Sequence, residues 1–330
     1  MSGEGAPALE VTGLVKHFPV GGRIVGGAGV VHAVEDVSFS LAEGELLGLV
    51  GESGSGKSTV ANCILRLVEP TAGTIRLLGT DITSLSRRKL RPHRRNVHMI
   101  FQDPYSSLNP RLTTGQIVGE PLRLHRLARG RALDARVAQL FDLCGLLPEL
   151  RFRYPHELSG GQRQRVGIAR ALAVEPRVLI ADEPVSALDV SVQASILNLL
   201  RDLQRDMRFS CLFITHDLST VEFLCDRVAV MYLGRIVEVA PRDLLFARPR
   251  HPYTQALLSA AVVPDPVVQR QRQRIVLEGD IPSPIEPPSG CAFRTRCPRA
   301  DESAPRSVEE VPELRHVGGG QRVACHLEVA

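Results

Sequence analysis

A glycine-rich loop at residues 51–59 constrains this chain more than any other feature of its sequence. The loop follows the pattern G-x-x-x-x-G-K-[ST], between an apolar run at 46–50 and a helical segment at 60–68. Because glycines let the backbone turn its N–H groups inward, and a helix N-terminus adds positive dipole, such a loop can cradle a polyphosphate. Lys57 suits the β- and γ-phosphates, and the Ser58 hydroxyl suits Mg²⁺. The expected binding residues are Gly51, Ser53, Gly54, Ser55, Gly56, Lys57, Ser58 and Thr59.

Length and charge narrow the class of protein. The 330 residues can form one large domain and a smaller appendage. A net charge of +4 and the absence of tryptophan do not suit a nucleic-acid platform, so we expect no nucleic-acid partner. No apolar run approaches the ~20 residues that span a bilayer. The first residues lack the character of a signal peptide, and we expect a cytosolic protein or one on the cytosolic side of a membrane.

Predicted strands and helices alternate along most of the chain. Strand-like apolar runs lie at 74–78, 97–101, 178–181, 211–215 and 228–231, and a helical pattern covers 190–203. This alternation predicts a three-layer α/β domain with a largely parallel sheet. Residues 9–50 alternate like half-buried strands, interrupted by glycines at 21–22 and 26–29, and 104–175 read as an inserted helical lobe. Beyond residue 250, six prolines predict a tail with little regular structure: Pro264, Pro266, Pro282, Pro284, Pro287 and Pro288.

Two carboxylates follow the predicted strand 178–181. Asp182 is suited to hold Mg²⁺ beside a phosphate loop, and Glu183 is suited to polarise a water in line with the γ-phosphate as general base. An Asp-Glu pair taken alone is more often a solvated turn. Its place after a buried strand, in a chain with a phosphate loop, favours the catalytic interpretation.

A second anion site is predicted at Ser159-Gly160-Gly161. Ser159 is a good N-cap for the helix that follows, and the two glycines let backbone approach a ligand closely. Alone, this tripeptide is more often a simple loop. In a chain with one nucleotide pocket, a second anion site indicates a dimer in which each helix end closes the nucleotide site of the other subunit.

Together these motifs resemble the ATP-binding-cassette (ABC) ATPases, with Leu158-Ser159-Gly160-Gly161-Gln162 similar to their signature motif. The resemblance implies ATP and Mg²⁺ as ligands. It implies a P-loop NTPase cassette with a mostly parallel core sheet, an antiparallel β subdomain and an inserted helical subdomain. It assigns Gln102 to the magnesium and attacking water, Asp189 to the loop that communicates across the dimer, His216 to the γ-phosphate and Phe18 to adenine stacking.

Other segments resemble the oligopeptide and dipeptide importers of this family. They are residues 101–111, 251–260, 279–284 and 287–298. The resemblance implies a cassette over 1–250, with its helical subdomain at about 104–175, and a C-terminal extension over 251–330. It implies a peripheral ATPase on the cytoplasmic face of the membrane. The implied partners are a second cassette, copy or paralogue, two integral membrane permeases and an extracytoplasmic peptide-binding protein.

The cysteines of the tail depart from this pattern. Similar extensions carry four cysteines, and several hold an iron–sulfur cluster. Here Cys291, Cys297 and Cys325 match three positions, and Ala304 stands at the fourth. Clusters generally want four thiolates. A cluster with an outside ligand, a zinc site that borrows His326, and three unligated thiols remain as alternatives. Cys63, Cys144, Cys211 and Cys225 lie in apolar segments and are predicted to be inert core thiols.

Three other functions compete with peptide import. The first is an importer for nickel, glutathione or an oligosaccharide, which shares many of these features. The second is a soluble ABC ATPase of DNA repair or translation, but no long coiled-coil insertion and no second cassette is visible. The third is a nucleotide-sensing regulator without turnover.

Overall fold

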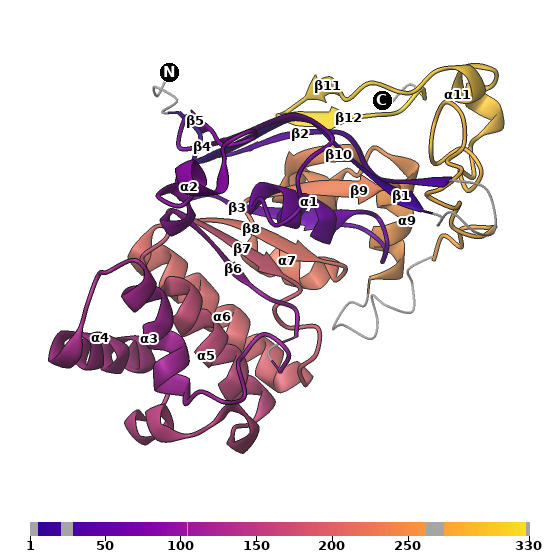
Figure 1. The fold of residues 1–330 in the computed structure, drawn as a ribbon. Helices are drawn as coiled ribbons and strands as arrows, with labels where there is room; N and C mark the ends of the chain where they lie inside the picture. The colour runs from indigo at the N-terminus through magenta and orange to yellow at the C-terminus, as the bar shows by residue number, and fades with distance from the viewer. Residues whose placement is uncertain (1–5, 21–28, 104, 262–273, 328–330) are drawn as a thin grey trace. The chain divides into compact units, whose positions relative to one another are not determined.

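The computed structural model describes residues 6–20, 29–103, 105–261 and 274–327. The chain forms two compact units, each built from segments that are distant in sequence. The first unit contains Met1–Leu9, Leu41–Glu45 and Leu77–Phe213, and the second contains Glu10–Ser40, Leu46–Arg76 and Ile214–Ala330. Figure 1 shows the elements of both units. Several residues named in the sequence analysis lie outside the described residues. They are Gly21, Gly22, Gly26, Gly27, Pro104, Pro264 and Pro266.

Three neighbouring strands of a larger sheet, in the order β8-β7-β6, form the buried centre of the first unit. Strand β6 (Val97–Ile100) runs parallel to β7 (Val178–Asp182), with Val97 opposite Val178, and β8 spans Ser210–Thr215. Every residue of β7 and β8 is buried. Strands buried on both faces read as continuous apolar runs, which is why the sequence located them.

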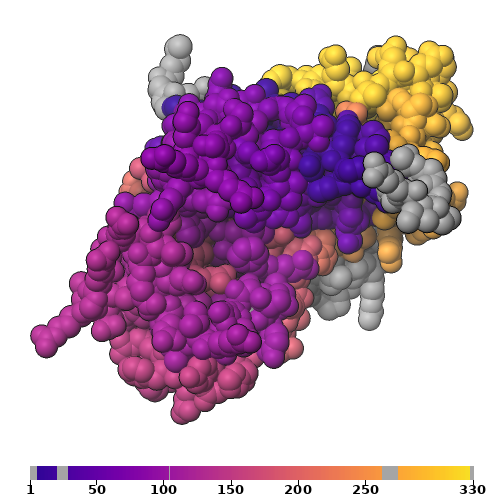
Figure 2. Space-filling model, in the orientation of Figure 1, coloured from indigo at the N-terminus to yellow at the C-terminus, as the bar shows by residue number. Residues whose placement is uncertain are grey.

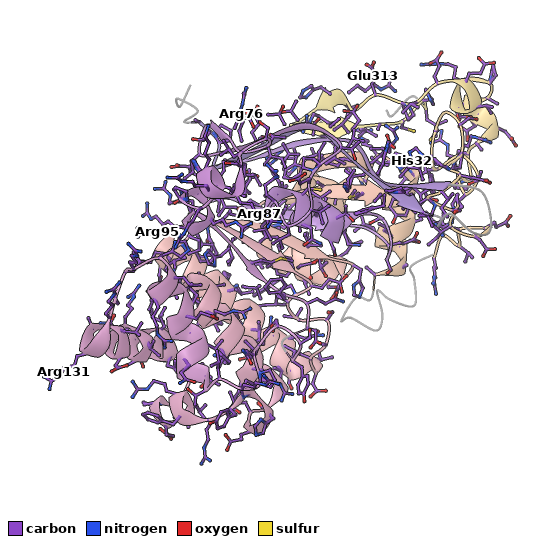
Figure 3. The ribbon with its side chains drawn as sticks, in the orientation of Figure 1. His32, Arg76, Arg87, Arg95, Arg131 and Glu313 are labelled. Carbon is purple, nitrogen blue, oxygen red and sulfur yellow. The ribbon has the colours of Figure 1, made fainter. Side chains whose placement is uncertain are left out.

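Helices make up most of residues 105–175, as predicted (Figure 1). They are α3 (Thr114–Leu124), α4 (Gly130–Leu143), the 3-10 turns Pro148–Phe152 and Pro155–Glu157, and α5 (Gly160–Leu172). Helix α6 (Val190–Met207) follows β7, and the short elements α2 (Arg87–Leu90) and His93–Arg95 precede β6. Apolar side chains at Ile117, Val118 and Phe141 form the buried faces of α3 and α4. Arg131, at the start of α4, extends into solvent (Figure 3).

The second unit holds five neighbouring strands of a larger sheet, in the order β11-β12-β10-β9-β3. Strand β3 (Leu46–Val50) is parallel to β9 (Arg227–Tyr232), and β10 (Arg235–Pro241) is antiparallel to β9. Helices α1 (Lys57–Ile64), α7 (Leu218–Leu224) and α8 (Arg242–Ala247) belong to the same unit. A Cβ atom on Gly48 would lie 2.8 Å from Cγ1 of Val221, so α7 packs directly on the backbone of β3.

Three further strands of this unit pair in the order β2-β1-β4. They are β1 (Leu9–Val20), β2 (Gly29–Leu41) and β4 (Ala72–Leu77), and the two-residue strand β5 (Thr80–Asp81) follows in the first unit. Leu14, Val37 and Ile75 are fully buried among the strands. Alternating burial along β1 and β2 explains the alternating pattern of the sequence over residues 9–50.

The prediction of an irregular C-terminal extension was wrong in part. Helix α9 (Pro252–Ala260) starts it, and β11 (Arg315–Gly318) and β12 (Gln321–Val323) form a hairpin that pairs with β10. The short elements Asp301–Ser303 and α11 (Arg306–Glu309) lie between them, while residues 274–300 have no helix or strand. In Figure 2 the yellow residues near the C-terminal end lie together on the surface. These strands are short, and they form because tertiary pairing outweighs weak local preference.

The extension is anchored through a buried carboxylate. Glu238 of β10 is fully buried, and its oxygens accept hydrogen bonds from the backbone N–H groups of Arg250 and His251 and from Nε2 of Gln321. Burial lowers the pKa of His251 to about 3, so its ring is neutral and Nδ1 caps α9 by accepting from the N–H of Tyr253. None of the described helices combines the length and apolarity needed to cross a membrane.

Candidate functional site

The phosphate loop joins β3 to α1 and packs against two neighbouring strands. A Cβ atom on Gly51 would lie 2.1 Å from the carbonyl oxygen of Met231, and one on Gly56 would lie 2.2 Å from that of Ala33. Gly56 also has a φ of 102°, a conformation that favours glycine. These two glycines are required by close backbone approach, which supports a fixed loop shape.

Lys57 is the first residue of α1, and its side chain folds back over the loop. It is 5% exposed, and Nζ donates to the carbonyl oxygens of Gly51 at 2.8 Å and Glu52 at 2.9 Å. Ser53, Gly54 and Ser58 are exposed, whereas Ser55 is buried. The ammonium group therefore bonds to the loop itself, and Ser53, Gly54 and Ser58 are the accessible residues of the loop; the phosphate cradle stays a prediction.

The predicted catalytic carboxylates lie at the end of β7. Asp182 is 6% exposed, and Glu183 follows it with a φ of 44°, which is uncommon for a non-glycine residue and typical of functional sites. Nε2 of Gln102 donates a hydrogen bond to Oε2 of Glu183 at 3.0 Å. The structure thus brings Gln102 and Glu183 together, although 81 residues separate them in sequence.

The predicted signature motif forms the start of α5. Ser159 is its N-cap: the N–H of Gln162 donates to Oγ of Ser159, and Oε1 of Gln162 accepts from the N–H of Ser159. Cβ atoms on Gly160 and Gly161 would lie 3.3 Å from Leu188 and 2.7 Å from Val192 of α6. The sequence predicted close approach to a ligand at these glycines, but the structure shows that Gly161 also allows close packing against α6.

The remaining predicted residues lie at element ends. His216 is exposed and directly follows β8. Asp189 is exposed and occupies the N-cap position of α6, without a capping hydrogen bond from its side chain. Phe18 is half-buried near the end of β1, with Nζ of Lys16 4.7 Å from its ring centroid.

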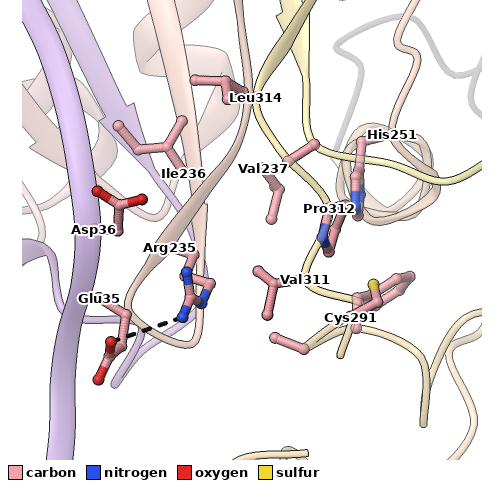
Figure 4. A pocket seen from close by; sticks show the side chains of 13 residues that line it. Glu35, Asp36, Arg235, Ile236, Val237, His251, Cys291, Val311, Pro312 and Leu314 are labelled. Atoms are coloured by element: carbon pink, nitrogen blue, oxygen red, sulfur yellow. Dashed lines mark ion pairs between the residues drawn. The ribbon is translucent and has the colours of Figure 1, made fainter. Parts of the chain in front are cut away.

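A cluster of two histidines and one glutamate lies beside Phe18. Nε2 of His17 and Nδ1 of His32 both contact Oε1 of Glu35. Nη2 of Arg235 lies 3.7 Å from Oε2 of Glu35 (Figure 4). Burial raises the pKa of Glu35, but the histidine hydrogen bonds and the charges of His17 and Arg235 outweigh it and lower the pKa. The charged carboxylate of Glu35 thus links β1, β2 and β10 through its contacts with His17, His32 and Arg235.

The tail cysteines Cys291, Cys297 and Cys325 are not among the tightly grouped candidate ligands of the described residues. Among the described residues, only His17, His32 and Glu35 bring three candidate ligand atoms within 4.8 Å of one another. Burial raises the pKa of all three thiols, and the neighbouring thiols raise the pKa of Cys291 and Cys297 further. Nε2 of His326 bonds to the carbonyl oxygen of Glu310. Cys291 lines a small cavity together with Val311 and Pro312 (Figure 4).

The four other cysteines are buried, as predicted. Burial raises the pKa of Cys63 to about 11 and those of Cys144 and Cys211 to about 12, which keeps these thiols protonated.

The fold and the side chains assembled on it define an ATP-binding-cassette ATPase. Residues 34–186 match the ABC transporter family, and residues 237–303 match the C-terminal region of oligopeptide/dipeptide transporters. This chain therefore belongs to the ABC transporter family, as one of its ATP-binding proteins with that C-terminal region.

Individual relatives agree with this assignment. The chain is 55% identical over 320 residues to the probable peptide ABC transporter ATP-binding protein y4tS of Sinorhizobium fredii, covering 97% of this chain and 89% of the relative. It is 50% identical over 321 residues to the oligopeptide transport ATP-binding protein AppF of Bacillus subtilis, covering 97% of each.

Solved structures agree with the assignment of the fold. The ATP-binding cassette MJ0796, solved as a dimer in a post-hydrolysis state with ADP and Pi, superimposes with a TM-score of 0.64 and 29% identity. The match covers 71% of this chain and 98% of the MJ0796 chain.

Sequence reasoning missed one set of residues around the phosphate loop. Glu52, the second residue of the loop, is bonded to Tyr253 and Arg296 of the extension. The only local signal is a carboxylate in a loop that is expected to hold an anion.

Proposed function

We propose that this protein is the ATP-hydrolysing subunit of an importer for oligopeptides or dipeptides. The observation that carries the proposal is the C-terminal region at 237–303, which matches that of oligopeptide/dipeptide transporters and accompanies a cassette with its motifs in place. The relatives named for peptide import and oligopeptide transport support it. We take the cassette as residues 1–250 and the extension as 251–330.

In this proposal the loop residues 51–59 hold the ATP phosphates, and Ser58, Gln102 and Asp182 hold Mg²⁺. Glu183 activates water, His216 supports the γ-phosphate and Phe18 stacks on adenine. Residues 159–161 and Asp189 act on the nucleotide of a second cassette, in keeping with the dimer of MJ0796. The hydrogen bond between Gln102 and Glu183 supports a shared role at the attacking water.

Exposed aromatic residues of the first unit support the proposal that the protein docks to two membrane permeases on the cytoplasmic face. Tyr105 and Phe152 are 64% and 74% exposed, and Tyr154 is exposed as well. Arg163 stacks at 5.3 Å from the Tyr105 ring centroid and donates to the carbonyl of Leu158. Exposed aromatic residues around a fixed arginine are typical of protein interfaces.

Reconstitution with co-expressed oligopeptide permeases and a peptide-binding protein tests the substrate. We expect ATP-dependent uptake of labelled di- to pentapeptides into vesicles, and we expect a Lys57→Ala variant to abolish this uptake. Uptake of nickel, glutathione or an oligosaccharide without peptide uptake would replace the substrate assignment. Co-purification with DNA or ribosomes instead of permeases would contradict the importer assignment.

For the tail we infer that Cys291, Cys297 and Cys325 pack as protonated thiols, with no resident metal. The three thiols are half-buried, and Ala304 stands where a fourth thiolate would be needed to complete a cluster. Anaerobically purified protein is expected to contain less than about 0.1 equivalent of iron, sulfide or zinc. Stoichiometric iron and sulfide would show a cluster completed by an outside ligand, and stoichiometric zinc would show a mononuclear site.

A further inference from the structure

Glu52 of the phosphate loop is bonded at each of its polar groups. Its N–H donates to Oη of Tyr253 at 2.9 Å. Its carbonyl oxygen accepts from Nζ of Lys57 at 2.9 Å and from the N–H of Ser55 at 3.2 Å. Its carboxylate accepts two hydrogen bonds from Arg296, from Nη1 at 2.8 Å and from Nη2 at 3.3 Å. The position of this one residue therefore depends on both the loop and the extension.

The two partners from the extension are held firmly in place. Tyr253 is fully buried, with its ring centroid 4.7 Å from that of Tyr232 and 5.4 Å from that of Phe293. The side chain of Arg296 is 9% exposed, and its guanidinium carbon lies 6.0 Å from the Tyr232 ring centroid. Tyr232 is the last residue of β9, which pairs with β3, the strand that leads into the phosphate loop. Buried side chains that are already held by their neighbours lose little conformational freedom when they bond to Glu52. They are therefore effective at fixing its position.

The charges of Glu52 and Arg296 bear directly on the binding of ATP. A carboxylate within a phosphate loop repels a polyphosphate, and the repulsion is strong where water is partly excluded. Arg296 neutralises this charge with a bidentate contact. Burial alone lowers the pKa of Arg296, but the hydrogen bonds to Glu52 and the charge of Glu52 outweigh that effect and raise the pKa above its usual value.

We propose that the C-terminal extension is part of the ATP site, with Arg296 as a positioning residue that neutralises Glu52 and fixes the start of the phosphate loop. The proposal rests on the loop binding ATP and not on the transported substrate. It gives the extension a role in nucleotide affinity within its own subunit. The expected signature is a change in ATP affinity with little change in turnover at saturating ATP.

Calorimetric titration of the full-length chain with MgATP tests the proposal. Arg296→Gln leaves the Glu52 carboxylate unpaired, and we expect the Kd for ATP to rise about tenfold, equal to about 1.4 kcal/mol. The matched control is Arg299→Gln, three residues along the same segment. Arg299 is 46% exposed and pairs with Glu302 on the surface, so its Kd is expected to stay within about twofold of the parent. A parental Kd for Arg296→Gln would overturn the proposal.

Variants of Glu52 separate charge from simple loss of structure. In the double variant Glu52→Gln with Arg296→Gln no charge is left unbalanced, and we expect the Kd to return to within about threefold of the parent. Glu52→Gln alone keeps the arginine and is expected to bind ATP at least as tightly as the parent. Weak binding by the double variant, or by Glu52→Gln alone, would show that the extension acts only as a structural support and would refute the positioning role. Because the isolated chain is titrated, failure of peptide uptake would leave this result unaffected.

Discussion

Replacing Glu183 with Gln is expected to reduce ATP hydrolysis by a factor of about 10² to 10⁴, the usual contribution of a general base. The substitution keeps the size of the side chain and its hydrogen-bonding reach toward Gln102, but it removes the group that accepts the proton of water. ATP binding is expected to persist. The variant should therefore accumulate as a closed, ATP-bound dimer, which gel filtration with MgATP and a phosphate-release assay would detect.

The control for this experiment is Glu43→Gln in the same unit. Glu43 pairs with Arg177 at 2.8 Å, and both side chains are more than half exposed. Exposed pairs contribute little to stability, so the turnover of this variant is expected to match that of the parent. Hydrolysis at the parental rate by Glu183→Gln would refute the role of Glu183 as general base.

Mixing two inactive variants is expected to restore activity if the ATP site is shared between subunits. Lys57→Ala disables the phosphate loop, and Ser159→Arg blocks the N-terminus of α5. A mixed dimer then carries one site with both lesions and one site with neither. In an equimolar mixture half of the dimers are mixed, so about a quarter of the parental ATPase rate is expected.

Each variant alone is expected to lose at least about 100-fold in hydrolysis, and the mixture is compared with the sum of the two. Thermal unfolding of each variant controls for folding, since loss of the Ser159 cap alone costs about 1 kcal/mol. No recovery on mixing, with both variants folded, would show that the loop and the signature motif of a single chain serve the same nucleotide.

The elements nearest the site could be predicted because their signals are local. The loop at 51–59 carries its own pattern, and β7 is a continuous apolar run that ends in Asp182. Ser159 and Gln162 are three residues apart, so the capping box of α5 can be read directly from the sequence. The ABC family, its fold and its ATPase activity followed from these local patterns taken together.

The features that were missed depend on contacts between distant residues. Glu52 and Arg296 are 244 residues apart, and nothing near either residue specifies the other. The β11–β12 hairpin has strands of four and three residues, whose stability depends on pairing with β10. Sequence patterns report the local preference of a segment, whereas both of these features depend on tertiary contacts.

Gly161 connects the signature motif to the interior of its own subunit. Any side chain at this position meets Val192 at 2.7 Å, before a nucleotide or a second cassette is involved. A loss of activity on substituting Gly161 therefore includes displacement of α6 within one subunit, besides any damage to the proposed interface with a second cassette. Ser159 has an exposed side chain, so substitutions there test the proposed interface more directly once the loss of its cap is controlled by thermal unfolding. Ser159 is then the better position for engineering cassettes that assemble only with a chosen partner.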